Sequence, residues 1–238
     1  MTRPTEHQPA VIPACARMTV ERSGAPTPMT QLVLHDYFRS SASFRVRIAL
    51  NLKGLDYQRV EVSLIAGEQR SDTYLEQNAQ GFVPMLVVDG EPIIQSMAII
   101  DWLDRSFPGP RLIPDEPMPR AVALARAQVI ASDIHPLNNL RVLKYLKRDL
   151  GLNEQTKDRW YRHWIAQGFD ALEAMAGEGK FLGGDAPGIA DCCLVPQMYN
   201  ARRFDTPLDD YPRLVAIDAA CMELDAFQRA HPDAVKPA

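Results

Sequence analysis

The stretch YFRSSASFRVRIAL, residues 37–50, places a pair of serines at the start of a helical pattern. It follows the strand-like run QLVLH at 31–35, and apolar residues recur at helical spacing until Gly54. The run YQRVEVSL at 57–64 then alternates in the way typical of a strand. Strand, helix and strand in this order predict a βαβ unit with parallel strands and a right-handed crossover.

A hairpin and a second helix complete this first part of the chain. Residues 83–94, VPMLVVDGEPII, predict two short strands joined by Asp89 and Gly90, a dipeptide favoured in tight hairpin turns. The run SMAIIDWLDRSF at 96–107 has the spacing of an amphipathic helix, and the proline-dense segment PGPRLIPDEPMP at 108–119 predicts a linker.

Beyond the linker the sequence carries only helical patterns. A long pattern over residues 120–149 is interrupted at Pro136, and three further helices are predicted over 154–176, 189–204 and 213–227. Pro136 and Pro196 predict kinks or breaks, because proline lacks the N–H that a helix interior requires. The predicted fold class is therefore α/β plus all-α.

These patterns divide the chain into four segments. Residues 1–28 are polar and rich in proline, lack the features of a signal peptide and predict a disordered extension, so that Met29 is a candidate natural start. We expect an α/β domain over 29–107, the linker over 108–119 and an all-helical domain over 120–238.

Composition excludes several classes of function. The 238 residues carry a net charge of −4 without a dense run of lysine and arginine, which argues against nucleic-acid binding. No apolar run approaches the ~20 residues of a membrane-spanning helix, so we expect a soluble, cytoplasmic protein. The cysteines show no metal-ligand spacing, and we predict free thiols and no metal site from Cys15, Cys192, Cys193 and Cys221.

The serines allow two interpretations. Backbone N–H groups point outward at a helix start, and Ser40, Ser41 or Ser43 would cap them. The same helix end would also stabilise an anion, either a phosphate or a thiolate. The segment lacks the glycines of a phosphate loop, which favours a thiolate. Since Ala42 stands where a cysteine would provide one, the sulfur must come from a cosubstrate.

Two further features favour a peptide-like anionic ligand. Val83 and Pro84 open the third strand, where a cis bond would expose the main chain of Val83 to a bound peptide. Gln95 and Ser96 begin the next helix, where N–H groups and a hydroxyl suit a carboxylate. Each feature is also compatible with an ordinary turn or cap.

The motifs FRSSASFRVRIAL, GFVPMLVVDG, IIQSMAIIDWL, IHPLNNLRVLKYL and ADCCLVPQMYNARRF together resemble the zeta class of glutathione transferases, over about residues 30 to 232. The resemblance implies an N-terminal thioredoxin-like domain, a C-terminal helical bundle, a homodimer and glutathione as cofactor. The implied activity is the cis–trans isomerisation of maleylacetoacetate to fumarylacetoacetate in tyrosine catabolism. Maleylpyruvate isomerisation, glutathione transfer or haloacid dehalogenation, and noncatalytic binding are the alternatives.

The resemblance also implies the site residues. Ser40 would donate to the glutathione sulfur with help from Ser41. The remaining cofactor-binding residues would be Val83, Gln95, Ser96, Gln69, His135 and Asn139. The carboxylates of the substrate would bind Arg39, Arg203 and Arg202.

Two positions depart from the family pattern. Many zeta enzymes have a cysteine where this chain has Ala42, and we expect its loss to be tolerated because glutathione brings its own sulfur. Gly188 replaces the hydroxyl residue of a capping box, although Asp191 is retained. That departure bears on the stability of the helix and not on the chemistry.

Overall fold

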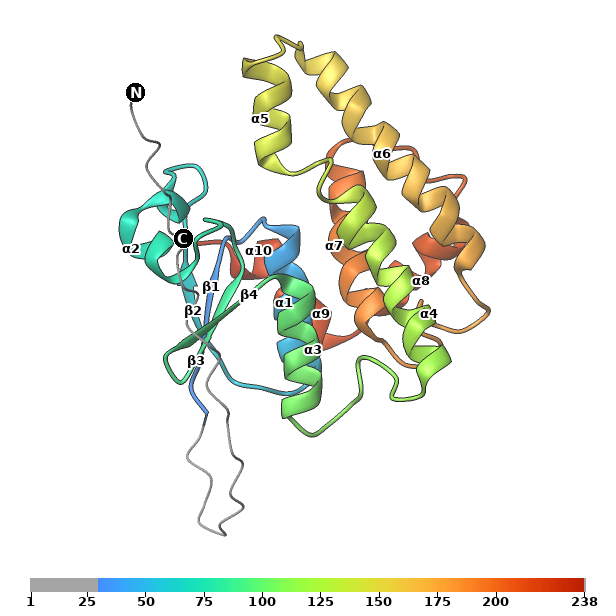
Figure 1. Cartoon of the computed structure of the whole chain (residues 1–238). Coiled ribbons are helices and arrows are strands. Elements are labelled where there is room, and N and C mark those ends of the chain that lie inside the picture. The colour runs from blue at the N-terminus through green and yellow to red at the C-terminus, as the bar shows by residue number, and fades with distance from the viewer. Residues whose placement is uncertain (1–29, 238) are drawn as a thin grey trace, which may run out of the picture. The chain divides into compact units, whose positions relative to one another are not determined.

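The structure is a computed structural model that describes residues 30–237, so the predicted extension 1–28 lies outside the described residues. The predicted βαβ unit is present as β1 (Leu32–Asp36), α1 (Ser41–Leu52) and β2 (Gln58–Glu61), and the two strands are parallel (Figure 1). Gly54 ends the helix with a φ of 65°, a conformation that glycine adopts without strain.

The predicted hairpin is also confirmed. Strands β3 (Met85–Val88) and β4 (Glu91–Ile94) pair antiparallel, and Asp89 and Gly90 turn the chain with φ values of 49° and 93°. Since β3 also pairs antiparallel with β1, the strand order is β2-β1-β3-β4.

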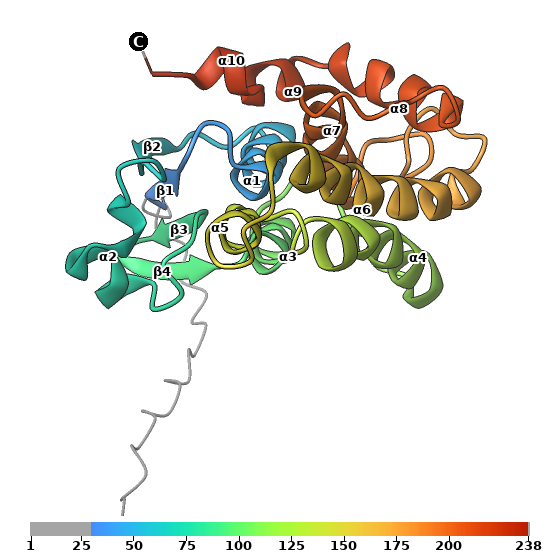
Figure 2. The same cartoon turned by 90° about the horizontal axis from the view of Figure 1, so that it is seen from above.

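Helices cover both sides of this sheet. Helix α1 and helix α3 (Ser96–Ser106) lie on one side, while the short helix α2 (Asp72–Gln77), which the sequence patterns did not predict, lies on the other (Figure 2). Helix α1 contacts α3 and also two helices of the C-terminal half. It is therefore buried on nearly all sides, arginines included.

As predicted, the regular elements of the C-terminal half are helices in the described residues, apart from an isolated β-bridge between Phe181 and Gly184. Its helices are α4 (Pro117–Gln128), a π-helical turn (Val129–Ile134), α5 (Leu140–Arg148), α6 (Glu154–Met175), α7 (Ile189–Arg203), α8 (Pro212–Met222), α9 (Asp225–Ala230) and α10 (Pro232–Val235). The predicted break at Pro136 is present between the π-helical turn and α5. At Pro196 the chain does not break, because α7 is enclosed by buried neighbours that hold its backbone.

The last described helices are hydrogen-bonded to the βαβ unit. The Nε of Arg47 on α1 donates to the carbonyl of Ala230, 2.9 Å away, and Nδ2 of Asn51 donates to Ala226 at the same distance. Arg59 on β2 donates to the carbonyl of Val235 across 3.0 Å. The C-terminal helices thus complete the hydrogen bonding of the first βαβ unit.

The segment between the two halves is fixed in place. The Asp104 carboxylate accepts from the N–H of Leu112 at 2.8 Å and of Ile113 at 3.3 Å, and both apolar side chains are buried. Helix α4 begins at Pro117, three residues before its predicted start at 120, since proline is well accommodated in a first helical turn.

Gly188 is required where α7 begins. The N–H of Ile189 donates to the carbonyl of Leu112 at 2.8 Å, and a Cβ at position 188 would lie only 2.9 Å from that oxygen. The Asp191 carboxylate still accepts from the N–H of Gly188 at 2.9 Å and also binds the N–H of Leu182. The helix start therefore keeps half of the capping box and gains a close approach to the linker.

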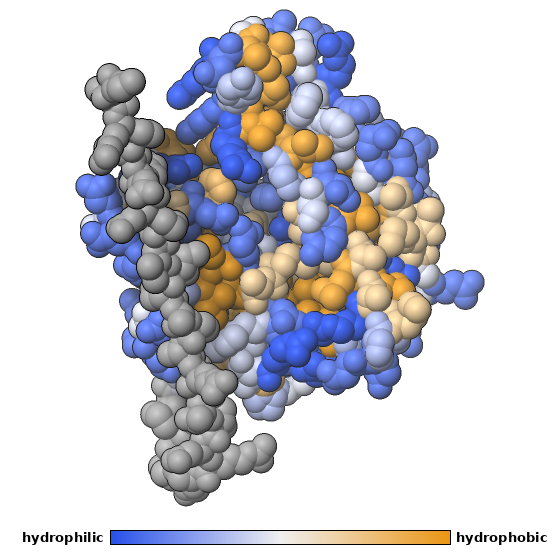
Figure 3. All heavy atoms as spheres, viewed as in Figure 1, coloured by the Kyte–Doolittle hydropathy of each residue, from blue (hydrophilic) through white to orange (hydrophobic). Residues whose placement is uncertain are grey.

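Apolar side chains emerge in patches on an otherwise hydrophilic surface, on the face shown in Figure 3. Met118 of α4 is 73% exposed, and Tyr145 and Leu150, in and after α5, are 56% and 55% exposed. Within residues 30–237, no helix is both long and apolar enough to cross a membrane. The described cysteines are free and buried, as predicted, and Cys15 lies outside the described residues.

Candidate active site

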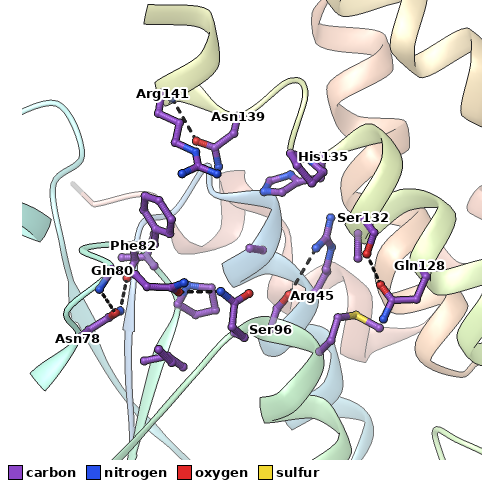
Figure 4. Close-up of a pocket in the computed structure, with 18 residues that line it drawn as sticks. Arg45, Asn78, Gln80, Phe82, Ser96, Gln128, Ser132, His135, Asn139 and Arg141 are labelled. Atoms are coloured by element: carbon purple, nitrogen blue, oxygen red, sulfur yellow. Dashed lines mark hydrogen bonds between the residues drawn. The ribbon is translucent and has the colours of Figure 1, made fainter. Parts of the chain in front are cut away.

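A pocket of about 440 Å³ lies between the α/β half and the helical half of the chain (Figure 4). Its walls come from the first turns of α1 and α3, the loop that leads into β3, and the segment from the end of α4 to the start of α5. The starts of two helices thus face one cavity. Their unpaired N–H groups make it suitable for anions.

At the start of α1, Ser40 occupies the N-cap position, and its Oγ accepts from the N–H of Ser43 at 3.2 Å. The capping interpretation of Ser40 is therefore confirmed. Because Oγ acts only as an acceptor there, its O–H can still donate to a ligand. Ser41 is buried and its Oγ accepts from Asn200 of α7 at 2.6 Å, while Ala42 lines the pocket.

The loop before β3 presents Val83 to the pocket. The Val83–Pro84 peptide bond is cis, and both residues line the cavity. The carbonyl of Phe82 accepts from the Tyr74 hydroxyl at 2.6 Å and from Asn78 Nδ2 at 2.8 Å. These two hydrogen bonds hold the loop against α2.

At the start of α3, a residue with a strained backbone, Gln95, precedes a residue with a hydroxyl group, Ser96. Gln95 has φ 74° and ψ 115°, a conformation that non-glycine residues rarely adopt and that clusters at functional sites. Its Nε2 donates to Gln80 Oε1 at 2.7 Å. Ser96, the first residue of α3, is buried, and its Oγ accepts from Arg45 Nη1 at 3.4 Å.

His135 and Asn139 approach the pocket from the helical half. Burial of the imidazole, together with the nearby positive charge of Arg45, lowers the pKa of His135 to about 3. His135 is therefore neutral at physiological pH. Asn139 caps α5 by accepting from the N–H of Arg141 at 3.1 Å.

The structure brings five predicted residues together around this pocket, namely Val83, Gln95, Ser96, His135 and Asn139. The predicted Ser40 and Ser41 directly precede its lining residue Ala42. Within the described residues, the remaining predicted positions do not line it. Gln69 lies in the short 3₁₀ turn before α2, and its Oε1 is buried without a partner.

The three predicted substrate arginines are exposed. Arg39 donates to the Tyr37 hydroxyl at 3.0 Å beside the start of α1. Arg202, at the end of α7, pairs with Asp218 at 2.7 Å, and the neighbouring Arg203 lies over the ring of Phe204. Their assignment to substrate binding stays a prediction.

Several lining residues escaped the sequence analysis, among them Arg45, Asn78, Gln80 and Arg141. Arg45 had a detectable signal, because an arginine within the apolar pattern of α1 occupies a position where a charge requires a partner. The others carried none, since their role depends on loops that meet only in the folded chain.

Comparison with known proteins agrees with this geometry. Family models described as the glutathione S-transferase N-terminal and C-terminal domains match residues 39–106 and 154–217. Maleylacetoacetate isomerase of Rhizobium meliloti is 47% identical over 210 residues, which cover 87% of this chain and 99% of that protein.

Solved structures give the same result. The holo structure of a maleylpyruvate isomerase, described as a bacterial zeta-class glutathione S-transferase, has a TM-score of 0.84 and 43% identity, covering 87% of this chain and 99% of that one. Maleylacetoacetate isomerase of Anaeromyxobacter dehalogenans, with dicarboxyethyl glutathione and citrate in its active site, has a TM-score of 0.78 and 42% identity, covering 88% and 98%.

The chain therefore belongs to the glutathione S-transferase family, and the predicted fold class is confirmed. Within this family its similarity is to zeta-class enzymes named maleylacetoacetate isomerase and maleylpyruvate isomerase.

Proposed function

We propose that this protein is a glutathione-dependent isomerase that converts maleylacetoacetate to fumarylacetoacetate, a step of tyrosine catabolism. The observation that carries the proposal is the pocket faced by the starts of α1 and α3. Among the described residues, its lining holds two arginines and no carboxylate. Such a site suits a ligand with a thiolate and several carboxylates.

Glutathione fits the residues present. A volume of about 440 Å³ is within the range of small-molecule sites. The described cysteines cannot replace its sulfur, because all three are buried and burial raises the pKa of each thiol. When bound, glutathione supplies a thiolate that adds reversibly to the conjugated alkene, so that the single bond rotates before elimination restores a trans double bond.

The chain's own groups would hold and orient this chemistry. The Ser40 hydroxyl and the N–H groups at the start of α1 would keep the sulfur ionised. The main chain of Val83 would bind the ligand as an added strand, and Gln95 and Ser96 would bind its γ-glutamyl carboxylate. Gln69, His135 and Asn139 would complete the cofactor site, and Ser41 would support the helix start through its bond to α7.

Arg39 and Arg203 would bind the carboxylates of the substrate, since guanidinium groups pair with carboxylates through two parallel hydrogen bonds. Arg202 would be the weaker contributor, because its charge is already paired with Asp218 at 2.7 Å. We also propose a cytoplasmic homodimer, with a thioredoxin-like domain over 29–107, a linker over 108–119 and a helical domain over 120–238.

Maleylpyruvate is the second candidate substrate. A maleylpyruvate isomerase has a TM-score of 0.84 to this structure, and the two substrates share the cis-alkene and the carboxylates. The pocket residues described above therefore suit both.

The test measures isomerisation of maleylacetoacetate, coupled to fumarylacetoacetate hydrolase, with and without glutathione and with maleylpyruvate in parallel. We expect turnover only with glutathione and a preference for maleylacetoacetate. Preference for maleylpyruvate keeps the chemistry and changes the substrate. Turnover of neither compound contradicts the proposal and favours haloacid dehalogenation, glutathione transfer or noncatalytic binding.

A further inference from the structure

Helix α1 carries two buried arginines in very different surroundings. Arg47 is 0% exposed and donates to the Asp36 carboxylate at 2.7 Å and to the carbonyls of Ala230 and Phe38 at 2.9 and 3.0 Å. Arg45 is 2% exposed, yet among the described residues the only hydrogen bond of its guanidinium joins Nη1 to Ser96 Oγ at 3.4 Å. Its Nε and Nη2 are buried without a partner.

No carboxylate of the described pocket lining offsets this buried charge. Among the described residues that line the pocket there is no carboxylate, and the other ionisable groups are Arg141, which is also positive, and His135, which is neutral. Cys193 lies near the arginine, and its thiol stays protonated because burial raises its pKa. A buried charge without a counter-ion is costly, so Arg45 requires an anion from outside the chain.

Arg45 is one of the residues that line the cavity. Side chains of a helix point back toward its N-terminus, and Ala42, one turn before Arg45, also lines the pocket. Figure 4 shows it directed into the cavity between Ser96 and His135. Nε and Nη2 form one edge of the planar guanidinium, the fork that pairs with both oxygens of a carboxylate.

A second feature points to the same place. Ser96 is the first residue of the 11-residue helix α3, whose free N–H groups favour negative charge. The helix start and the unpartnered arginine thus converge on one point from two different elements.

We propose that Arg45 binds a carboxylate of the ligand through Nε and Nη2, while Nη1 keeps Ser96 in place. This inference rests on the proposed function, since it gives the anionic ligand of that site a residue not assigned to it above. The carboxylate comes either from the γ-glutamyl end of glutathione or from the dicarboxylate substrate. The position beside Ser96 favours glutathione.

The unpaired charge of Arg45 should lower the stability of the ligand-free protein, and this effect can be measured independently of activity. Arg45→Met removes a charge without a partner, so the melting temperature of the ligand-free protein should rise by roughly 2 to 4 °C. Arg47→Met is the matched control on the same helix. It breaks a paired arginine and should lower the melting temperature.

Calorimetric titration identifies the carboxylate. Wild-type and Arg45→Met proteins are titrated with S-methylglutathione and with its analogue in which 4-aminobutanoate replaces the γ-glutamyl residue and the α-carboxylate is absent. Malonate is titrated separately, in the presence of saturating S-methylglutathione. We expect Arg45→Met to bind S-methylglutathione about 30-fold more weakly than the wild type does. The analogue should bind to both proteins with the same affinity.

The other outcomes are equally definite. If only malonate binding weakens by about 30-fold, Arg45 serves the substrate carboxylate and the proposal holds with that source. If both peptides and malonate bind the variant as they bind the wild type, or if Arg45→Met melts lower as Arg47→Met does, the proposal is overturned. A wild-type protein that binds S-methylglutathione and isomerises neither substrate contradicts the proposed function alone.

Discussion

Arg47 of α1 lies 2.7 Å from the carboxylate of Asp36 on β1, and neither side chain is exposed. Arg59 of β2 approaches the other oxygen of that carboxylate at 2.9 Å. Three elements of the βαβ unit therefore share one buried ionic network. Because the arginines also bind carbonyls of the last helices, the network links the α/β half to the end of the chain.

Loss of Arg47 should be strongly destabilising. Arg47→Met leaves the buried Asp36 with Arg59 alone, and we expect the free energy of unfolding to fall by about 3 kcal/mol. Urea denaturation measures this value. Arg229→Met removes an exposed partner of Asp225 and should change stability by less than about 1 kcal/mol. Equal effects of the two substitutions would contradict a special role for the buried network.

A serine at position 188 should lower the stability of the protein, although serine is a favourable N-cap residue for a helix such as α7. Gly188→Ser completes the capping box in sequence, but its Cβ would lie 2.9 Å from the Leu112 carbonyl. We expect a loss of about 1 to 3 kcal/mol, because the linker must shift. Gly177→Ala is the control, since a Cβ there meets nothing within 4 Å. A more stable Gly188→Ser variant would show that the linker moves freely.

His135 should make stability depend on pH. Its folded pKa of about 3 lies below the usual 6.5, so its contribution is complete above pH 6.5 and is lost as the pH falls toward 3. Between about pH 7.5 and about pH 5.5, the wild type should lose about 1 kcal/mol more than His135→Gln, which cannot titrate. Urea denaturation of both proteins at the two pH values measures this difference. Parallel losses would mean that His135 titrates normally.

Ser40 should act on the cofactor sulfur as well as on the helix. Ser40→Ala removes the N-cap and should cost about 1 kcal/mol of stability. Turnover should also fall by about 100-fold, because the thiol pKa of bound glutathione rises. Ser71→Ala provides the comparison, since Ser71 caps α2 by accepting from the N–H of Tyr74. Ser71→Ala should lose similar stability and keep the turnover of the wild type. If Ser71→Ala lost as much turnover as Ser40→Ala, the role of Ser40 would be that of a structural cap.

Ala42 should not limit the reaction. Ala42→Cys introduces a thiol on the pocket wall, next to the serine pair. We expect isomerase turnover close to that of the wild type together with new inactivation by iodoacetamide, because the three described cysteines are buried and the added thiol lines the pocket. Ala42→Ser controls for size. A large gain in turnover in Ala42→Cys but not in Ala42→Ser would show that a sulfur of the protein takes part in the reaction.

The sequence predicted the elements whose signals are local. The alternation in 57–64, the Asp89–Gly90 turn and the periodic stretch 96–107 each specify their structure within a few residues. Helix α2 was missed because its six residues are too short to show a period.

From the residues alone, the site was predicted only at the starts of α1 and α3 and at the strand that follows Val83, while His135 and Asn139 were implied by the family resemblance. The strain at Gln95 and the missing partners of Arg45 depend on side chains from distant segments, and no local pattern encodes them. Similarly, the unbroken α7 reflects the neighbours that enclose Pro196, whereas the local rule for proline predicted a kink or a break and no break is present.

The hydrogen bond from Arg47 to Ala230 spans 183 positions of the chain. During synthesis, the first strand and helix leave the ribosome long before the segment that accepts their donors. The two arginines of the buried ionic network therefore lack these carbonyl acceptors until α9 and α10 have been synthesised. A nascent chain stalled before α9 should expose this network to water and depend on chaperones. The βαβ unit would then reach its native packing only after the last helices have been made.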